Sequence, residues 1–432
     1  MSRALLLLAV CLSLPALAAP VNYLVVATGN DTTSAKAAVV ANGGTVVADL
    51  NAIGVVAASA DSANTGFAAA VAASPGVLSA DADPDINWLP AGESLVSIDS
   101  DPAAGGVNTE PFSGLQWNMR QIHADQTAAA GNLGAGAVVA IIDTGLNSQH
   151  RDLVDRIDTA RSVAFVNSIA GAGFPAWEDD VFHGSHVGCI VAASINDFGV
   201  QGVAPSATLV AVKVLNSKGS GSFTNVIRGI EYAASIGVDV INMSLGATFD
   251  RNNAGGNGGG EPFGHFLAAL TRAVNHATQA GVLVVSAAGN NAVDLNSRIM
   301  SVPAQSGNGV AVSATGPIAQ ANFDRLASYS NWGASVINFA APGGDLVPPN
   351  GVVQDLVPSC GNRRAGNANT FFFAAGTSMA TPHVAGVAAL LVGKLGHVGP
   401  ARLKAVIGNT AANVLPTAFQ GRGRVDAAAA LK

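Results

Sequence analysis

The chain has 432 residues, of which 49% are hydrophobic and 11% charged, so it is long enough for a large domain and a smaller one. This composition excludes a largely disordered chain. The formal net charge is −7 and the sequence holds no Lys/Arg-rich block, which argues against nucleic-acid or anionic-membrane partners, because both need a concentrated basic surface.

Residues 1–18 are typical of an export signal. A basic residue precedes an apolar run, and Ala16-Leu17-Ala18 has the small-x-small pattern of a cleavage site, so we expect cleavage before Ala19. The run is too short for a comfortable membrane span, and no later stretch of about 18 uncharged apolar residues follows. We therefore expect a secreted protein, extracellular or periplasmic, without membrane attachment after cleavage.

Cys11 leaves with this signal, so Cys189 and Cys360 remain. They could pair in an oxidising compartment, or stay as a buried thiol and a loop thiol. The sequence leaves both alternatives open.

Residues 19–90 predict a small α+β domain, because short apolar runs (23–26 and 45–58) alternate with Ala-rich helical patterns (34–42 and 66–73). Residues 91–112 are rich in Gly, Pro, Ser and Asp, and we interpret them as a mobile, easily nicked linker.

From residue 113 to 432 apolar strands alternate with helical stretches, a pattern typical of a parallel sheet with helices on both faces. We expect strands at 137–142, 208–215, 238–243, 282–287 and 310–313. The carboxyl ends of parallel strands share one edge, so Asp143, Ser244 and Asn290 should meet there. The glycines of GNLGAGAVVAIID precede their strand, so they do not form a dinucleotide-binding fingerprint.

The segment HGSHVGC places His183 and His186 at i and i+3, where they could bind zinc. No acidic residue or third histidine has a matching helical offset, so nucleophilic catalysis fits better. Ser378 in GTSMATPHVAG could be an ordinary helix N-cap. Alternatively, the Ser378 hydroxyl is a nucleophile, with His183 as its base and Asp143 to orient that imidazole. The Asn290 amide and the Ser378 N–H would then be the oxyanion donors, which completes the groups that acyl transfer requires.

These motifs together resemble the subtilisin-like serine proteases (subtilases): DTG at Asp143, HGSH at His183, SLG at Ser244, AAGN ending at Asn290, and GTSMATPH around Ser378. The resemblance covers about residue 113 to the end. It implies an α/β fold with a parallel sheet flanked by helices, and a secreted serine endopeptidase that acts on polypeptides through these residues. A catalytically silent binding protein of the same fold is the alternative, disfavoured because the chemical positions are intact.

The resemblance also implies where a peptide lies extended: between two edge segments, Gly219-Ser220-Gly221 after Lys218, and Ser244-Leu245-Gly246. The pocket for the fourth residue before the cut would be lined by Phe223, Val226 and Leu245, and the pocket for the residue just before it by Ala287, Gly289 and Ser301. These positions carry no charge, so we expect a broad, apolar preference. Phe223 and Val226 could equally be plain core residues.

The family often holds a structural calcium ion at positions that correspond to Asp152 and Asn196. The family's N-terminal glutamine ligand has no assigned counterpart in this sequence, although Gln116 is nearby. The domain at 19–90 resembles the family's inhibitory pro-segment, cleaved here somewhere within 88–114. This implies a zymogen, with its own propeptide as a partner, and we expect a monomer.

The sequence departs from the family pattern at Ser185 and Cys189, and in a Gly/Asn-rich insertion at 247–262, expected as a solvated, flexible loop. We expect His186 and His383 to be packed and hydrogen bonded. Surface or helix positions are expected for His123, His150, His265, His276 and His397.

Overall fold

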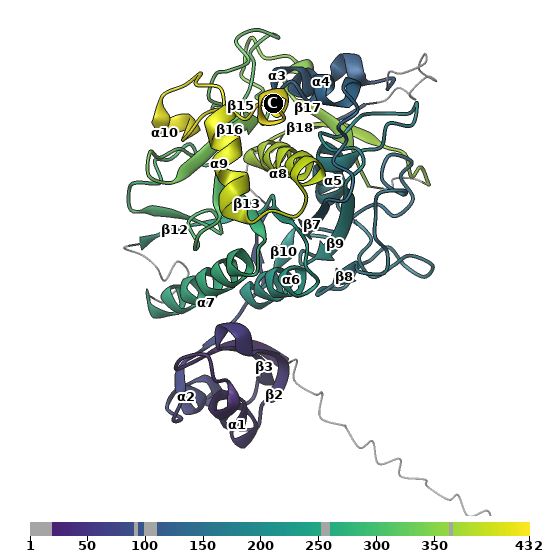
Figure 1. Ribbon diagram of the computed structural model, residues 1–432. Helices are drawn as coiled ribbons and strands as arrows, with labels where there is room; N and C mark the ends of the chain where they lie inside the picture. The colour runs from purple at the N-terminus through teal and green to yellow at the C-terminus, as the bar shows by residue number, and fades with distance from the viewer. Residues whose placement is uncertain (1–19, 90–93, 99–109, 252–259, 363–365) are drawn as a thin grey trace, which may run out of the picture.

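The computed structural model describes residues 20–89, 94–98, 110–251, 260–362 and 366–432. The expected export signal lies outside these residues, as does most of the predicted linker. The described chain forms a small N-terminal domain that lies against a larger one (Figure 1).

The N-terminal domain is a four-stranded antiparallel sheet in the order β2-β3-β1-β4, with two helices on one face. Its elements are β1 (Pro20–Ala27), α1 (Thr33–Ala41), β2 (Thr45–Leu50), η1 (Asn51–Ile53), β3 (Val55–Asp61), α2 (Phe67–Ala72) and β4 (Val77–Ala82). Tyr23 and Phe67 pack at 4.7 Å between ring centroids in a core of its own. This is the α+β domain that the alternating pattern predicts.

The large domain is built on a seven-stranded parallel sheet in the order β16-β15-β13-β11-β7-β9-β8. Its strands are β7 (Val138–Asp143), β8 (Val163–Ala164), β9 (Thr208–Lys213), β11 (Val240–Met243), β13 (Leu283–Ala287), β15 (Val310–Thr315) and β16 (Ile337–Pro342). The five predicted strands are confirmed to within two residues at each end. The short β8 and the edge strand β16 were not predicted.

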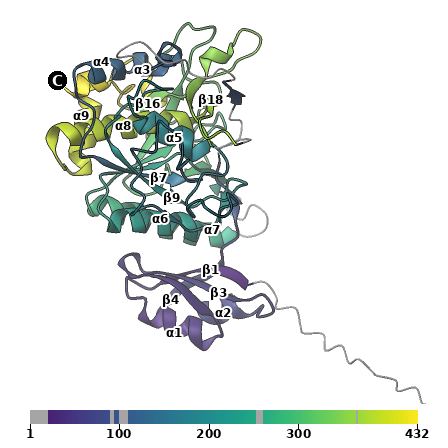
Figure 2. The ribbon, with the colours of Figure 1, turned by 90° about the vertical axis from the view of Figure 1, so that its right-hand side faces the viewer.

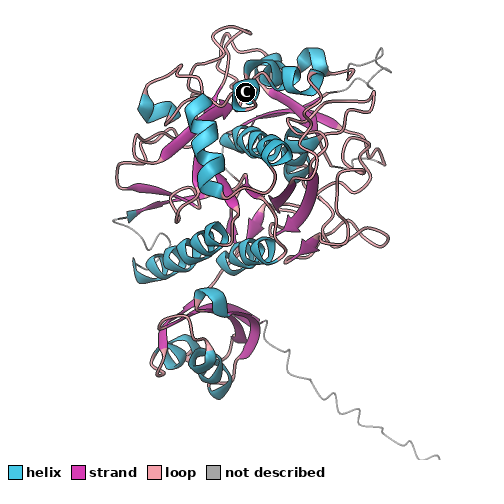
Figure 3. Cartoon of the chain, viewed as in Figure 1, coloured by secondary structure: helices cyan, strands magenta, loops and turns pink. Residues whose placement is uncertain are grey.

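Helices cover both faces of this sheet (Figure 3), so its strands are apolar on both sides. The four main helices are α5 (His183–Ala192), α6 (Phe223–Ser235), α7 (Gly260–Gln279) and α8 (Thr377–Leu395). Val139 and Ile141 of β7 share a core with α5 and α8, and Ala140 and Ile142 share one with α6 and α7. The N-terminal domain packs through β1 and β4 on α6 and α7 (Figure 2).

Smaller elements complete the large domain. Its remaining helices are η2 (Ser113–Leu115), α3 (Trp117–Gln121), α4 (Ala124–Ala129), η4 (Val353–Asp355), α9 (Pro400–Thr410), α10 (Thr417–Gln420) and α11 (Ala427–Ala430). Its remaining strands are β6 (Ser94–Ser97), β10 (Ser220–Gly221), β12 (Ala247–Asp250), β14 (Ile299–Val302), β17 (Val357–Cys360) and β18 (Phe371–Ala375). The two-residue β5 (Ile86–Asn87) follows the N-terminal domain.

Two segments expected to be irregular contain strands. Within the predicted linker, β6 pairs with β18 in a three-stranded sheet. At the start of the predicted flexible insertion, β12 pairs with β14, and Phe249 of β12 packs on Phe263 of α7 at 4.0 Å. Residues 252–259 of the insertion lie outside the described part.

Cys189 of α5 and Cys360 of β17 form a disulfide. The bond joins the helix that begins at His183 to the strand pair that leads into α8. Among the described helices, α8 alone is long and apolar enough to cross a membrane, and 83% of that stretch is buried inside the protein, as in a core helix.

Candidate active site

Asp143 and His183 form a buried pair at the carboxyl edge of the sheet. Asp143 ends β7 and His183 begins α5, and the His183 Nδ1 lies 2.8 Å and 3.0 Å from the two carboxylate oxygens of Asp143. Both side chains are fully buried. The N–H of Thr144 donates to Asp143 Oδ1 at 2.7 Å, which holds the carboxylate in place. The carboxylate therefore binds the Nδ1 edge of the imidazole and fixes the orientation of the ring.

Ser378 enters this edge from the first turn of α8. Its hydroxyl donates to the carbonyl oxygen of Ser244 at 3.0 Å, and the Ser244 hydroxyl donates back to the Ser378 carbonyl at 2.8 Å. Asn242 pairs with Ile141 in the parallel register, so two residues further on Ser244 lies beside Asp143. The strand register thus places Ser378, through its bonds to Ser244, at the same sheet edge as the carboxylate and imidazole, and its hydroxyl donates to Ser244.

Ser378 is not the helix N-cap that the isolated motif suggests. Gly376 occupies that position, and Ser378 lies inside the helix. Its hydroxyl is therefore free of any capping role and faces the edge of the sheet.

Asn290 is held by the residue that precedes Ser378. Its Oδ1 accepts hydrogen bonds from the Thr377 N–H at 2.9 Å and the Thr377 hydroxyl at 2.7 Å. Its Nδ2 is buried and has no partner within the described chain. The clamp on the oxygen leaves the amide N–H groups available as hydrogen-bond donors beside Ser378.

For the zinc alternative, the described residues form no cluster of three candidate ligands that includes His183 or His186. The His186 Nε2 bonds the carbonyl of Phe372 at 3.1 Å. Among the described residues, the one cluster of three candidate ligands is His150, Cys189 and Cys360, whose sulfurs form the disulfide. It does not include His183 or His186.

Comparisons with known proteins agree with this geometry. The Subtilase family model matches residues 134–426. The chain belongs to the subtilase family. It is 37% identical to Subtilisin Savinase of Lederbergia lenta over 318 residues, which cover 74% of this chain and 99% of that protein. It is 36% identical to the M-protease of Shouchella clausii (strain KSM-K16) over 357 residues, 82% of this chain and 79% of that one.

A solved structure extends the likeness to nearly the whole fold. The epidermin leader peptide processing serine protease of Staphylococcus aureus superposes with a TM-score of 0.75 at 23% identity, covering 96% of this chain and 98% of that one. The family and the relatives show that this subtilase is a serine endopeptidase. Its substrates are therefore polypeptides.

The two predicted edge segments of this subtilase hold a stretch of its own chain. Strand β5 pairs antiparallel with β10, with Asn87 opposite Ser220. The Trp88 N–H donates to the carbonyl of Gly219 at 3.0 Å, and the Gly246 N–H donates to the carbonyl of Trp88 at 2.8 Å. Residues 86–88 are thus bonded main chain to main chain between 219–221 and 244–246, as a bound peptide would be.

The Trp88 side chain lies in the predicted apolar pocket. Its ring packs edge-on against Phe223 at 4.8 Å, in a core that also contains Val226 and Leu245, and its Nε1 donates to the carbonyl of Gly221 at 2.9 Å. Phe223 also stacks on Phe266 of α7 at 4.8 Å. Phe223 and Val226 are therefore core residues that lie in one cluster with the Trp88 side chain. Phe266, which contacts Phe223, was missed by sequence reasoning.

The second predicted pocket is also assembled from distant segments. A Cβ on Gly246 would lie 3.9 Å from Ser301 Oγ and 4.0 Å from the Ala287 carbonyl. Gly289 has φ +99°, and a Cβ there would lie 2.5 Å from Asn331 Nδ2 and 3.2 Å from Ser301 Oγ. Only glycine therefore fits at position 289, and the three positions predicted for this pocket lie together beside Gly246.

Asp152 and Asn196 meet in a buried polar site. Each has a buried Oδ1 without a partner in the described chain, and burial raises the pKa of Asp152 to about 8. Glu110, from a distant segment, packs against the loop of Asn196, where its carboxylate accepts the N–H groups of Asn196, Asp197 and Phe198 at 2.7 to 3.1 Å. The Gln116 side chain pairs with the main chain of Gln201.

His150 was expected at a surface or helix position, but it lies outside the helices and is fully buried. Its Nδ1 accepts the Asp152 N–H at 3.1 Å, its Nε2 lies 3.2 Å from the Thr370 carbonyl, and its ring packs against Phe371. Because its neighbours in the sequence, Gln149 and Arg151, are polar, the burial of His150 by distant residues could not be predicted. His186 and His383 are buried and bonded as expected, and His123, His265, His276 and His397 are partly exposed.

Proposed function

We propose that this subtilase cleaves peptide bonds with Ser378 as nucleophile, His183 as general base and Asp143 as the group that orients His183. The observation that supports it most strongly is the meeting of the Asp143–His183 pair, the Ser378 hydroxyl and the Asn290 amide at one edge of the sheet. A silent fold used for binding would have no need of this convergence.

The chemistry follows from the contacts. His183 takes the Ser378 proton as the oxygen attacks the carbonyl, and the Asp143 carboxylate stabilises the imidazolium that forms. The Asn290 Nδ2 and the Ser378 N–H stabilise the oxyanion. The Ser378 hydroxyl must first turn from Ser244 to His183. A substrate N–H that takes over the Ser244 carbonyl would release it.

We further propose that the chain is secreted as a zymogen and that the N-terminal domain inhibits it until it is cleaved away. Residues 86–88 support this, because they lie where a substrate would lie and exclude it. Asp83 adds a second anchor, since its carboxylate accepts the N–H groups of Phe223 and Thr224 at the start of α6. The uncharged pockets support a broad, apolar preference.

Calcium fits the site at Asp152 and Asn196, because both side chains offer an unpartnered oxygen and calcium prefers oxygen ligands. The ion would be structural: it would offset the buried carboxylate and tie the loop at 194–200 to the segment at 152. It has no part in the peptide-bond chemistry.

The experiment is Ser378→Ala in the full chain. We expect casein digestion to be lost and the N-terminal domain to remain attached, while the circular-dichroism spectrum is unchanged. A Ser335→Ala variant, which changes a partly exposed serine at Asn296, serves as the control. Undiminished digestion by the Ser378→Ala protein would contradict the proposal.

A further inference from the structure

The hairpin of β17 and β18 runs directly into the turn that carries Ser378. Strand β18 ends at Ala375, three positions before Ser378. In the sheet β17-β18-β6, one edge of β18 pairs with β17 and the other pairs with β6, which is the outer strand. The edge of β18 that β6 covers therefore lies next to the proposed nucleophile.

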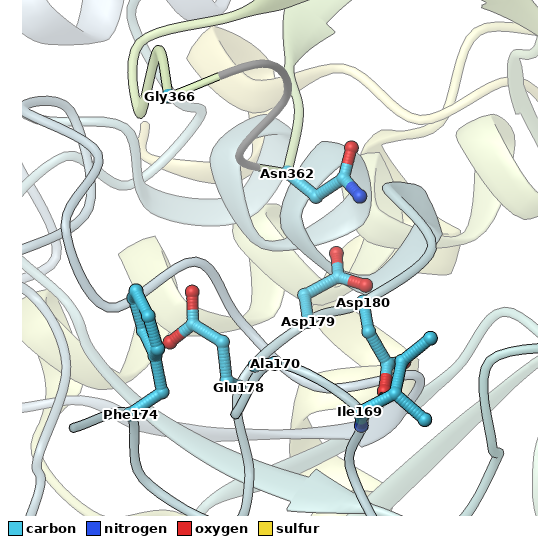
Figure 4. Close-up of a pocket in the computed structure, with 8 residues that line it drawn as sticks. All are labelled: Ile169, Ala170, Phe174, Glu178, Asp179, Asp180, Asn362 and Gly366. Carbon is cyan, nitrogen blue, oxygen red and sulfur yellow. Dashed lines mark hydrogen bonds between the residues drawn. The ribbon is translucent and has the colours of Figure 1, made fainter. Parts of the chain in front are cut away.

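This hairpin is anchored to the large domain at its far end. The disulfide ties β17 to α5. In the connection between the two strands, the Ala368 carbonyl accepts the Asn147 amide at 2.7 Å. Asn362 and Gly366 of the same connection line a cavity together with Glu178 (Figure 4). The edge of β18 thus belongs to a hairpin that is held in place independently of β6.

The chain's own segment at 94–98 occupies this edge as an added strand. Residues 94–97 of β6 lie opposite residues 375–372 of β18 in antiparallel register. The Ile98 N–H continues the ladder, because it donates to the Phe371 carbonyl at 2.9 Å. Pairing of this kind uses main-chain groups, which every extended peptide carries. A peptide of another sequence can therefore take the same place.

Every second side chain of this segment packs on the protein. Val96, which lies opposite Phe373, and Ile98 both contact one apolar cluster. Leu95 and Ser97 lie between them in the sequence and are exposed. The other members of the cluster are Leu115, Tyr329, Val353, Leu356 and Ala375. The edge of β18 thus offers an apolar surface to alternate residues of a bound strand.

The chain lies on both sides of the proposed nucleophile. Residues 86–88 are bonded to the segments at 219–221 and 244–246, and six positions after residue 88 Ser94 lies on β18. Ser378 is close to both places, because its hydroxyl bonds to the second of these segments and it follows β18 by three positions. Since residues 86–88 lie as the part of a substrate before the cut would lie, β6 lies as the part after the cut would lie.

We propose that the edge of β18 binds the part of a polypeptide substrate that follows the scissile bond, and that the cluster around Phe373 selects apolar side chains at alternate positions of that part. The inference rests on the proposed function, because it takes Ser378 as the nucleophile. Residues 94–98 are then a built-in occupant that a substrate replaces after processing. An edge without an occupant would leave main-chain groups unpaired and the apolar cluster in water, which favours the binding of such a peptide.

An internally quenched peptide with the sequence of residues 86–100 tests this on the processed enzyme. The enzyme carries Val96→Ser and Ile98→Ser, so that its own segment does not compete. We expect kcat/KM to fall at least roughly tenfold when the peptide carries the same two changes, because the burial of two apolar side chains is lost. A peptide with Leu95→Ser, which changes an exposed position, is the matched control and should be cleaved as the parent peptide is.

A second enzyme variant assigns the effect to the cluster. Val353→Ser should reduce the discrimination between the two peptides, whereas Val352→Ser, at the exposed neighbour, should retain it. A short chromogenic peptide without residues after the cut should be hydrolysed equally by these enzymes. Failure of the proposed function would abolish the dependence of both substrates on Ser378, whereas failure of this inference would affect the long peptides alone.

Equal kcat/KM for the parent peptide and the peptide with Val96→Ser and Ile98→Ser would overturn the proposal, as would a discrimination that Val353→Ser leaves unchanged. A cut in the parent peptide outside residues 88–94, located by mass spectrometry, would also overturn it, because the segment of β6 would then not follow the cut. If the enzyme with Val96→Ser and Ile98→Ser does not mature, the parent enzyme decides the outcome.

Discussion

The amide oxygen of Asn290 accepts two hydrogen bonds from Thr377, the residue immediately before Ser378. This contact fixes the proposed oxyanion donor to the same turn that carries the proposed nucleophile. It also means that the amide is oriented before substrate arrives, which is the condition under which such a donor is effective.

Asn290→Ala should therefore lower kcat by roughly 10²- to 10³-fold with little change in KM, because the lost bond acts on the transition state. Thr377→Val keeps the amide but removes one of its two anchors, and should lower kcat by a smaller factor. Initial rates on a chromogenic peptide measure both. Asn291→Ala, an exposed neighbour, is the control. A KM effect without a kcat effect would mean that Asn290 only binds substrate.

Trp88→Ala should weaken inhibition by the N-terminal domain at least roughly 100-fold, since truncating a fully buried tryptophan costs about 3 to 5 kcal/mol. Trp88→Phe keeps an apolar ring but loses the bond to the Gly221 carbonyl, so its effect should be smaller. The measurement is the inhibition constant of residues 20–89 added to the processed enzyme. Equal inhibition by all three forms would show that residues 86–88 do not hold the domain in place.

Buried histidines should make the fold sensitive to acid. Burial lowers the pKa of His383 to about 4, whereas an unfolded chain binds that proton below about pH 6.5. The contribution of His383 is thus complete above pH 6.5 and is lost as the pH falls toward 4, at up to about 1.4 kcal/mol per pH unit. His150 and His186, each lowered to about 3 by burial, act in the same direction.

Urea unfolding of the processed, sulfonyl-inactivated enzyme between pH 7 and 4.5 measures this dependence. His383→Gln should reduce the slope of the unfolding free energy against pH by the contribution of one histidine, which is up to about 1.4 kcal/mol per pH unit. Carboxyl groups whose pKa burial raises, such as Glu231, act in the opposite direction but are common to both proteins, so the difference isolates His383. Parallel curves for the two proteins would contradict the assignment.

Removal of calcium should destabilise the enzyme. Chelation is expected to lower Tm by roughly 5 to 10 °C, because a tightly bound ion contributes about 4 kcal/mol at a large excess over its Kd. In Asp152→Asn most of this shift should be absent, while Asp155→Asn should retain it. Differential scanning fluorimetry gives both values. An unchanged chelation shift in Asp152→Asn would place the main calcium site elsewhere.

The sequence predicts the sheet because strands such as VVAIID are apolar on both faces. It also predicts the functional edge, because these strands end in polar residues and the carboxyl ends of parallel strands lie at one edge of the sheet. Asp143, His183, Ser378 and Asn290 also stand in short motifs, so each could be named from its neighbours. The pairing of β12 with β14 could not be predicted, because it joins residues 247–250 to residues 299–302, about fifty positions further along the chain.

Side chains that act across long separations were missed for the same reason. Glu110 bonds a loop 86 residues further along, and Phe266 reaches Phe223 from a different helix. The seating of Trp88 in a pocket of the large domain likewise needs the two domains docked. Local sequence patterns do not predict such long-range contacts. A motif such as GTSMATPH, by contrast, can be recognised from a few consecutive residues.

The central claim is that Ser378 is the residue acylated by substrate. The most direct measurement treats the processed enzyme with phenylmethylsulfonyl fluoride, digests it and locates the sulfonyl adduct by mass spectrometry. One adduct on Ser378, formed in parallel with the loss of peptidase activity and absent from His183→Ala, is the predicted result. An adduct on another residue, or full inactivation with Ser378 unmodified, would contradict the account.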